Sequence, residues 1–282
     1  MPKIAILTDS TANLPLEWVQ KNEIGVIPIK ILWENESFLD GIDITSEEFY
    51  DRLSHTRSLP TTSQPSIQDF LQAFESLAEG SDGIVVPLIS SGISGTVASA
   101  QAAARQFSRV PVEIVDTRVT STGQAMVVLA AAHAAMQGKS LQDVRRAADN
   151  VVERMHLLFA VDTLEYLHRG GRIGGATRYL GTALNLKPIL YFDSNGRLDA
   201  LERVRTKAKS LQRLISLAEE QANGHPIHLG IIHANALQVA QEFHEQITHH
   251  LECKEVFTLE LSPAIGVHVG PGTIGISFFT EN

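Results

Sequence analysis

The stretch Gly83-Ile-Val-Val-Pro87-Leu-Ile-Ser90-Ser91-Gly92-Ile-Ser94-Gly95-Thr96 runs from an apolar segment into a turn rich in hydroxyls and glycines. Residues 83–86 predict a buried strand, and the alanine-rich run from Val97 to Phe107 favours a helix. The N–H groups at the start of a helix lack intrahelical acceptors and lie at the positive end of the helix dipole. The turn is therefore a candidate site for a small anion, either a phosphate or a carboxylate.

An ordinary helix cap is the alternative explanation for this turn, because Ser94 or Thr96 alone can satisfy the first helical N–H groups. Residues 91–97 nevertheless hold three hydroxyls and two glycines, which is more than a cap needs. A second hydroxyl cluster, Pro60-Thr-Thr-Ser-Gln-Pro-Ser66, precedes a helix expected at residues 67–78. The two clusters favour a shared anion site, and two unrelated caps are the alternative.

The first half of the chain alternates apolar strands with helices. Strands are expected at residues 3–7, 25–33, 83–86 and 112–116, and helices at 67–78, 97–107, 124–137 and 140–155. Continuous apolar strands separated by helices are typical of a mainly parallel sheet that is covered on both faces. This pattern predicts an α/β N-terminal domain over residues 1–156.

The second half predicts a mixed-sheet α/β domain over residues 157–282. Strands are expected at 157–161, 187–192, 198–203, 228–233, 255–261 and 274–279, and helices at 207–222 and 238–251. Asp193-Ser-Asn-Gly196 is a strong signal for a hairpin between the second and third of these strands. The sequence therefore predicts a two-domain α/β protein.

The composition is that of an ordinary globular protein, with 44% hydrophobic and 20% charged residues in a chain of 282. The net charge of −9 disfavours nucleic acid as a partner, because no excess of positive charge meets the phosphates. The single cysteine, Cys253, excludes an internal disulfide and is typical of a reducing compartment. The start of the chain does not read as a signal peptide, and no apolar run reaches the ~20 residues of a membrane span. We therefore expect a cytoplasmic location.

Further candidate binding residues lie in the second half. Arg169-Gly-Gly-Arg172-Ile-Gly-Gly175 places two arginines among four glycines, and guanidinium groups often bind carboxylates or phosphates. Solvated arginines beside a glycine helix cap are the alternative. His268 lies among apolar neighbours beside a glycine turn, and it is either a packed core histidine or a ligand group. The basic stretch from Arg203 to Lys209 is either a solvated face or a docking surface.

Cofactor and metal motifs are not convincing. Gly270, Gly272 and Gly275 match G-x-G-x-x-G, but residues 274–279 are expected to form a closing strand without a following helix or acidic residue. Dinucleotide binding is therefore rejected. The histidine spacing gives no convincing metal set, and we expect neither a metal nor a cofactor.

Four motifs taken together resemble the DegV family. They are TDSTANLP at residues 8–15, TTSQPS at 61–66, SSGISGT at 90–96, and RGGRIGG at 169–175 paired with HVGPGTIG at 268–275. Their order and spacing agree with the family along nearly the whole chain. The resemblance implies a two-domain DegV-like α/β fold and a non-catalytic, fatty-acid-binding subunit of a bacterial fatty acid kinase. Such a subunit holds one fatty acid and presents its carboxylate to a separate ATP-dependent subunit, and the acyl phosphate made there is used for phospholipid synthesis.

The resemblance also implies roles for individual residues. A first group would bind or adjoin the carboxylate, and it comprises Thr62, Ser63, Ser94, the Gly95 amide and His268. A second group would lie at the mouth or face the kinase, and it comprises Arg172, Arg203 and Arg205. The chain departs from the family at Gly92, where a bulkier residue is common. Thr61 doubles the threonine, so that either Thr61 or Thr62 would reach the ligand.

The implied ligand is a long-chain fatty acid, and its chemistry suits these residues. Burial of the tail contributes about 0.8 kcal/mol per CH₂, and a buried carboxylate needs several donors. We expect the tail tunnel to run among the alanine-rich helices of the first domain. The expected partners are the fatty acid and the kinase subunit, with at most transient membrane contact and no nucleic acid.

Two rival functions come from other classes. One is a hydrolase or acyltransferase in which Ser94 attacks and His268 is the base, although Thr96 replaces the second glycine of a G-x-S-x-G elbow. No carboxylate that would orient His268 is obvious from the sequence. The other is a phosphate or nucleotide binder, which lacks a P-loop lysine and a carboxylate cluster for a metal.

Overall fold

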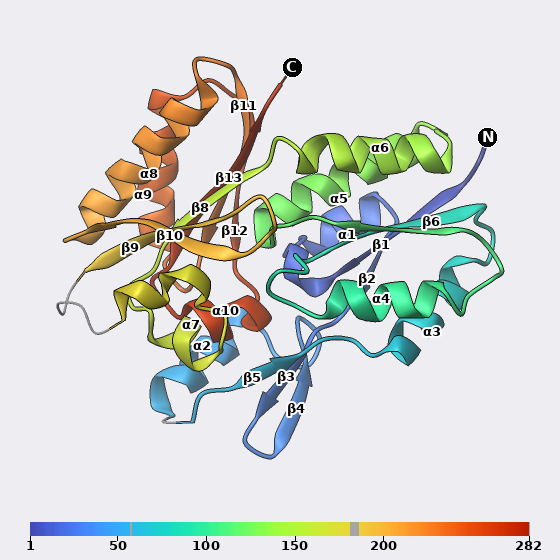
Figure 1. Ribbon diagram of the computed structural model, residues 1–282, viewed down its shortest axis with the longest axis horizontal. Helices are drawn as coiled ribbons and strands as arrows, with labels where there is room; N and C mark the ends of the chain where they lie inside the picture. The colour runs from blue at the N-terminus through green and yellow to red at the C-terminus, as the bar shows by residue number, and fades with distance from the viewer. Residues whose placement is uncertain (57, 181–185, 282) are drawn as a thin grey trace.

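The computed structural model describes residues 1–56, 58–180 and 186–281, and these residues form three sheets with helices packed around them (Figure 1). The N-terminal part holds a parallel sheet with strand order β2-β1-β6-β7. Its elements are β1 (Ile4–Asp9), α1 (Leu16–Lys21), β2 (Ile24–Ile27), α3 (Ile67–Leu77), β6 (Gly83–Leu88), α4 (Thr96–Ala104), β7 (Val112–Asp116), α5 (Ser121–Met136) and α6 (Leu141–Val152).

The parallel sheet is apolar throughout because both of its faces are covered. Along β6, Val85 packs with α5 and α6 on one face, while Ile84 and Val86 pack with α3 and α4 on the other. Successive side chains of a strand point to opposite faces, so a strand covered on both sides needs a continuous apolar run. The predicted parallel sheet is thus confirmed.

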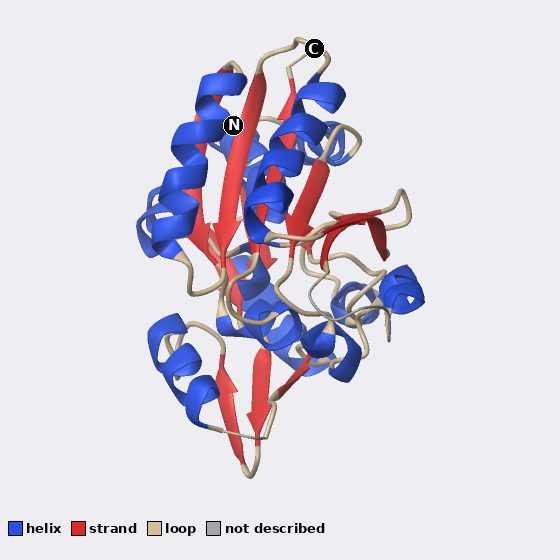
Figure 2. Cartoon of the chain, turned by 90° about the vertical axis from the view of Figure 1, so that its left-hand side faces the viewer, coloured by secondary structure: helices blue, strands red, loops and turns tan. Residues whose placement is uncertain are grey.

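The C-terminal part holds a mixed six-stranded sheet with strand order β10-β9-β8-β13-β11-β12. Its elements are β8 (His156–Ala160), β9 (Lys187–Phe192), β10 (Leu198–Val204), α8 (Lys207–Ala222), β11 (Ile227–His233), α9 (Leu237–His250), β12 (Cys253–Glu260) and β13 (Ile274–Thr280). Helices α8 and α9 cover one face, in front of the sheet in Figure 2. Strand β8 sends Leu158 and Ala160 to that face and Leu157 and Phe159 to the opposite one. The opposite face is therefore free to pack against the rest of the molecule.

A third, antiparallel sheet with strand order β4-β3-β5 lies below the two larger sheets (Figures 1 and 2). It consists of β3 (Lys30–Trp33), β4 (Glu36–Leu39) and β5 (Thr61–Ser63). Around it lie α2 (Ser46–His55), α7 (Glu165–Arg169), α10 (Pro263–Val269) and the 3₁₀ helices η1 (Ser10–Ala12) and η2 (Gly174–Tyr179). Trp33 of this sheet and Phe159 of β8 belong to one apolar cluster. The third sheet therefore shares its core with the C-terminal sheet, although its strands belong to the N-terminal half of the sequence.

Three elements differ from the sequence-based expectation. The run at 25–33 is not one strand, because β2 ends at Ile27 and Pro28, which has no N–H to donate, precedes the turn into another sheet. Thr61–Ser63 forms strand β5, and Ser66 caps the following helix with Asp69. Residues Pro263–Val269 form helix α10, for which the sequence predicted no element. Among the residues described, no helix is both long enough and apolar enough to span a bilayer.

Candidate functional site

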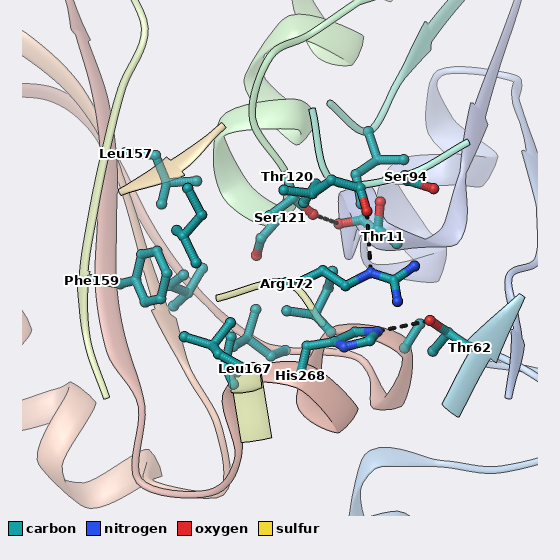
Figure 3. Close-up of a pocket in the computed structure, with 18 of the residues that line it drawn as sticks. Thr11, Thr62, Ser94, Thr120, Ser121, Leu157, Phe159, Leu167, Arg172 and His268 are labelled. Atoms are coloured by element: carbon teal, nitrogen blue, oxygen red, sulfur yellow. Dashed lines mark hydrogen bonds between the residues drawn. The ribbon is translucent and has the colours of Figure 1, made fainter. Parts of the chain in front are cut away.

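A partly enclosed cavity of about 80 Å³ lies between the N-terminal half and the free face of the six-stranded sheet (Figure 3). One end is polar, and it is lined by Thr11, Thr62, Gln64, Ser94, Thr120, Ser121, Arg172 and His268. The other end is apolar, and its wall includes Leu157, Phe159, Leu167, Phe192, Leu198 and Ile232. This division suits a ligand with a small polar head and an apolar tail.

Thr62 and His268 meet at the polar end of the cavity. The Oγ1 of Thr62 lies 2.8 Å from Nε2 of His268, and the pair is visible in Figure 3. Thr62 is the middle residue of β5, so the alternation of a strand turns it to the opposite face from Thr61 and Ser63. His268 lies on α10, and the Asp40 carboxylate accepts a hydrogen bond of 3.1 Å from the Ala264 N–H in the first turn of this helix.

His268 is held in its neutral form. Burial, together with the positive charge of Arg172, lowers the pKa of its ring to about 4. The Nδ1 atom is buried and has no hydrogen-bond partner among the described residues. Gly170 lies against this nitrogen, since a Cβ at position 170 would collide with it. A neutral imidazole has one nitrogen that donates a hydrogen bond and one that accepts, and it adds no positive charge to the site.

Ser94 and Gly95 form the turn that leads into α4. Ser94 Oγ lies 2.8 Å from Thr96 Oγ1, and Gly95 is the residue directly before the helix. A Cβ at Gly95 would lie 2.6 Å from Nε2 of Gln64, so the glycine allows the two hydroxyl-rich segments to approach each other. Ser94 lines the cavity and α4 begins two residues later, so the positive end of the α4 dipole lies at the polar end of the cavity.

The buried carboxylate of Asp9 joins segments that lead into the polar end of the cavity. It accepts hydrogen bonds from the N–H of Ile89 at 2.9 Å and from the N–H of Thr11 at 3.0 Å, and from Nε2 of Gln124 at 3.2 Å. Burial raises the pKa of this carboxyl above its ordinary value. Asp9 thus ties together the ends of β1 and β6 and the start of α5. Asp9 also caps η1, where its side chain accepts the hydrogen bond from Thr11.

Arg172 supplies positive charge at the polar end of the cavity. Its Nε donates to the carbonyl of Ile93 at 3.3 Å, and its Nη1 donates to the carbonyl of Gly170 at 2.7 Å. Figure 3 shows the guanidinium between Ser94 on one side and the Thr62–His268 pair on the other. Because backbone carbonyls hold two of its nitrogens, Arg172 is fixed in place without a carboxylate partner in those bonds.

The structure gathers some of the sequence-predicted residues and separates others. Thr62, Ser94, Arg172 and His268 line one cavity, and Gly95 adjoins it. Ser63 lies on the other face of β5, with its Oγ 3.5 Å from the carbonyl of Gln64. The alternation of the strand therefore turns Ser63 away from the cavity that Thr62 lines, although it was predicted at the carboxylate site.

Arg203 and Arg205 are exposed and do not line the cavity. They lie at and just beyond the end of β10, about 20 Å along the strand from Leu198 at its start, by the rise of an extended chain. The Arg203 guanidinium lies 4.5 Å from the centre of the Tyr179 ring. These arginines therefore belong to the exposed surface and not to the cavity lining.

The apolar cavity does not lie where the tail tunnel was expected. It runs over Leu157 and Phe159 of β8 instead of among the alanine-rich helices of the first domain. Those helices pack tightly against the parallel sheet, where Ala100, Ala131 and Ala132 are buried. Sequence reasoning also missed Thr11, Gln64, Thr120 and Ser121 at the polar end. A signal existed for Thr11 and Gln64, which lie within the hydroxyl-rich motifs.

The geometry does not form a serine–histidine catalytic pair. Within the described part of the chain, Ser94 Oγ is hydrogen-bonded to Thr96 and Nε2 of His268 to Thr62, and no hydrogen bond joins Ser94 to His268. No carboxylate meets Nδ1 of His268 there either. A triad needs both contacts, whereas donors around an apolar cavity suit binding.

Comparison with known proteins shows the family of the chain. Residues 3–281 match a family model described as "Uncharacterised protein, DegV family". The chain belongs to the DegV family. A DegV domain-containing protein of Halalkalibacterium halodurans is 36% identical over 283 residues and covers both chains completely. The protein DegV of Bacillus subtilis is 33% identical over 97% of this chain and 98% of its own.

Solved DegV structures share the fold. A DegV family protein of Thermus thermophilus, described as binding fatty acid, superposes with a TM-score of 0.93 at 33% identity, covering 99% of this chain and 100% of that one. DegV of Bacillus subtilis, described as a fatty acid binding protein, gives a TM-score of 0.92 at 32% identity over all of both chains. The predicted DegV-like α/β fold, with one parallel and one mixed sheet, is confirmed.

Proposed function

We propose that this protein is a fatty-acid carrier that holds one fatty acid in the cavity between its two halves. The observation that carries this proposal is the cavity itself, in which polar donors at one end adjoin an apolar wall at the other. The DegV structures from Thermus thermophilus and Bacillus subtilis, both described as fatty acid binding, support it.

The carboxylate would lie at the polar end. The hydroxyls of Thr62 and Ser94 and the N–H groups at the start of α4 are donors for its two oxygens, and Arg172 offsets its charge. A carboxylate removed from water needs such donors, because a buried charge without hydrogen bonds is costly. His268 would keep Thr62 in position through its 2.8 Å contact, and its neutral form lets the pair rearrange around the ligand.

The tail would extend along β8 past Phe159 toward Leu157, which Figure 3 places away from the polar end. Each methylene removed from water there contributes about 0.8 kcal/mol. Most of the affinity would come from the tail, and the head group would fix the orientation. The same orientation brings the carboxylate toward the hydroxyl-rich turns and Arg172.

The bound carboxylate would then be presented to a separate ATP-dependent kinase subunit. In that step a carboxylate oxygen attacks the γ-phosphorus of ATP held by the partner, ADP leaves, and an acyl phosphate results for phospholipid synthesis. The carrier itself would perform no catalysis. The exposed Arg203 and Arg205 are the candidates for contact with the partner, because a basic surface attracts an acidic or nucleotide-bearing one. A cytoplasmic location remains a prediction.

Native mass spectrometry of the protein purified from a bacterial host tests the carrier function. One fatty acid per chain is expected, and denaturation with lipid extraction would identify its tail. Ser94→Ala and His268→Ala are expected to lose ligand, whereas Ser91→Ala is the matched control, because the exposed Ser91 hydroxyl bonds Asp116 instead of facing the cavity. An empty protein that also takes up no added fatty acid would contradict the proposal.

A fluorophosphonate probe separates the carrier from the serine-hydrolase alternative. Labelling of Ser94 would favour the hydrolase, and absence of labelling together with a bound fatty acid supports the carrier. Addition of ATP to the isolated protein tests the nucleotide-binding alternative, which predicts a higher melting temperature. Added ATP and a purified fatty acid kinase subunit should convert the bound fatty acid to an acyl phosphate only when both are present.

A further inference from the structure

The tip of the β9–β10 hairpin rests on the turn that follows β6. We define the hairpin tip as residues 193–197. Ser90 Oγ donates a hydrogen bond of 2.7 Å to the carbonyl of Gly196 in this tip. Two glycines permit the contact: a Cβ at Gly92 would collide with the Gly196 carbonyl, and a Cβ at Gly196 would collide with Ser90 Oγ. The two segments are 106 residues apart in sequence.

The hairpin tip is internally rigid. The Asp193 carboxylate accepts hydrogen bonds from the N–H groups of Asn195 at 2.8 Å and Arg197 at 2.9 Å, and the Asp193 N–H donates to the Arg197 carbonyl at 2.9 Å. Gly196 has φ +69°, which a glycine adopts without strain. Because its bonds are internal, the tip can leave the Ser90 turn as one unit and keep its own shape.

The hairpin contributes to the cavity wall at the base of its tip. Phe192 and Leu198 are paired in register at its base, and both line the cavity. The ladder between β8 and β9 ends at the pair Leu158–Tyr191, so everything beyond Tyr191 overhangs the sheet. The tip is therefore held at its base by the pairing of β9 with β10, and at its end by the hydrogen bond from Ser90 to Gly196.

An acyl chain cannot enter the cavity as it stands. Its volume of about 80 Å³ is smaller than the ~150 Å³ of a cavity that holds one benzene molecule. Phe192 or other wall residues must move before a long tail fits. Phe192 and Leu198 belong to this wall and flank the overhanging tip, so movement of the tip displaces part of the wall.

We propose that the hairpin tip is a latch at the fatty-acid cavity. The hydrogen bond from Ser90 to Gly196 and the close contact between Gly92 and Gly196 hold it closed. This inference rests on the proposed function, since it concerns how the fatty acid enters and leaves. Opening exposes Phe192 and Leu198 and admits the tail, and closing returns both side chains to the cavity wall.

Stopped-flow binding of cis-parinaric acid, a fluorescent fatty acid, tests the latch. Ser90→Ala removes the closing hydrogen bond, so association and dissociation rates should both rise about five-fold, the effect of one neutral hydrogen bond on the opening equilibrium. The dissociation constant should stay within about two-fold, since both rates change together. Gly92→Ala, whose Cβ prevents the tip from seating, should raise both rates at least as much, and Ser91→Ala should change neither.

A second measurement needs no fatty acid. In a Cys253→Ser background, Leu198→Cys places one thiol beneath the tip, where Leu198 is 4% exposed. Adding Ser90→Ala should increase the reaction rate of this thiol with Ellman's reagent about five-fold, and adding Ser91→Ala should not. This assay tests the latch even if the protein binds no fatty acid, so its result is independent of the proposed function.

Two outcomes would overturn the latch. A faster dissociation with an unchanged association rate in Ser90→Ala would mean that Ser90 stabilises the bound ligand and does not govern entry. Equal thiol reactivity in the Ser90→Ala and Ser91→Ala proteins would mean that the Ser90–Gly196 contact does not hold the tip closed. Failure of fatty acid binding in the wild-type protein would count against the carrier function alone.

Discussion

Thr62 on β5 and His268 on α10 are 206 residues apart in sequence, yet Oγ1 of the first lies 2.8 Å from Nε2 of the second. The histidine ring is neutral because burial and Arg172 lower its pKa to about 4. The pair therefore joins the third sheet to the C-terminal helix by a hydrogen bond between uncharged groups. Since both residues line the cavity, the contact positions Thr62, a donor of the proposed carboxylate site, relative to His268.

Removal of the Thr62 hydroxyl should weaken fatty acid binding. Thr62→Val keeps the shape of the side chain and loses one hydrogen-bonding group, so the dissociation constant should rise about 5- to 10-fold. His268→Gln should give a similar loss. Calorimetric titration of the double variant should show less than the sum of the two effects, because the residues act through one contact. Full additivity would indicate that they bind the ligand independently.

Gly170 should be needed to keep His268 in place. Gly170→Ala introduces a Cβ that would collide with Nδ1 of His268, so the ring must move and fatty acid affinity should fall by at least ten-fold. Gly171→Ala is the matched control, since a Cβ there meets nothing within 4 Å, although its φ of +70° strains an alanine. Melting curves and binding should separate the two, with lower stability in Gly171→Ala and lower affinity in Gly170→Ala.

Phe159 and Leu158 are neighbours on β8 that face opposite sides of the sheet. Truncation to alanine should cost about 2–5 kcal/mol of unfolding free energy for either residue, because each leaves a cavity in a packed core. Only Phe159→Ala enlarges the proposed fatty-acid cavity, so it should alter the preferred tail length. Urea unfolding and mass spectrometry of the bound lipid would check both effects. A changed lipid profile in Leu158→Ala would contradict the assignment of the faces.

Tyr50 carries a buried hydroxyl with no hydrogen-bond partner in the described parts of the chain. Burial, together with the nearby carboxyls of Glu260 and Asp40, raises its pKa. Tyr50→Phe removes this unsatisfied group and keeps the ring, so the free energy of unfolding should rise by about 1 kcal/mol. Tyr50→Leu loses the ring as well and should be less stable than wild type. A destabilised Tyr50→Phe in thermal melts would show that the hydroxyl does have a stabilising contact.

Neutral His268 should make the protein less stable in mild acid. Below pH 6.5 the unfolded chain protonates this histidine, whereas the folded protein does so only near pH 4, so the unfolded state binds more protons in this window. The contribution of His268 should fall as the pH drops from 6.5 to 4, by up to about 3 kcal/mol.

His268→Gln isolates this effect, because other groups titrate in the same window. Burial also lowers the pKa of His156 and His233, which adds to the loss, and it raises the pKa of Asp9 and Asp40, which opposes it. The difference in unfolding free energy between wild type and His268→Gln should therefore depend on pH. Parallel curves for the two proteins between pH 4 and 7 would rule out the lowered pKa.

The sequence by itself determined the α/β character of both halves of the chain and about half of the polar lining of the site. Apolar runs such as Gly83–Leu88 became buried strands, and the Thr45–Glu48 capping box starts α2, because both patterns act through neighbours in the chain. The family motifs also located Thr62, Ser94, Arg172 and His268, which line one cavity.

Only the tertiary structure decided which faces of these elements meet. Strand alternation turned Thr62 toward His268 and Ser63 away from it. The packing of β8 against the third sheet placed the apolar cavity over Phe159 and not among the alanine-rich helices. The hydrogen bond from Ser90 to Gly196 joins residues that are 106 positions apart in the sequence. Local patterns fix secondary structure, but the site consists of contacts between distant segments, and these exist only when the sheets pack.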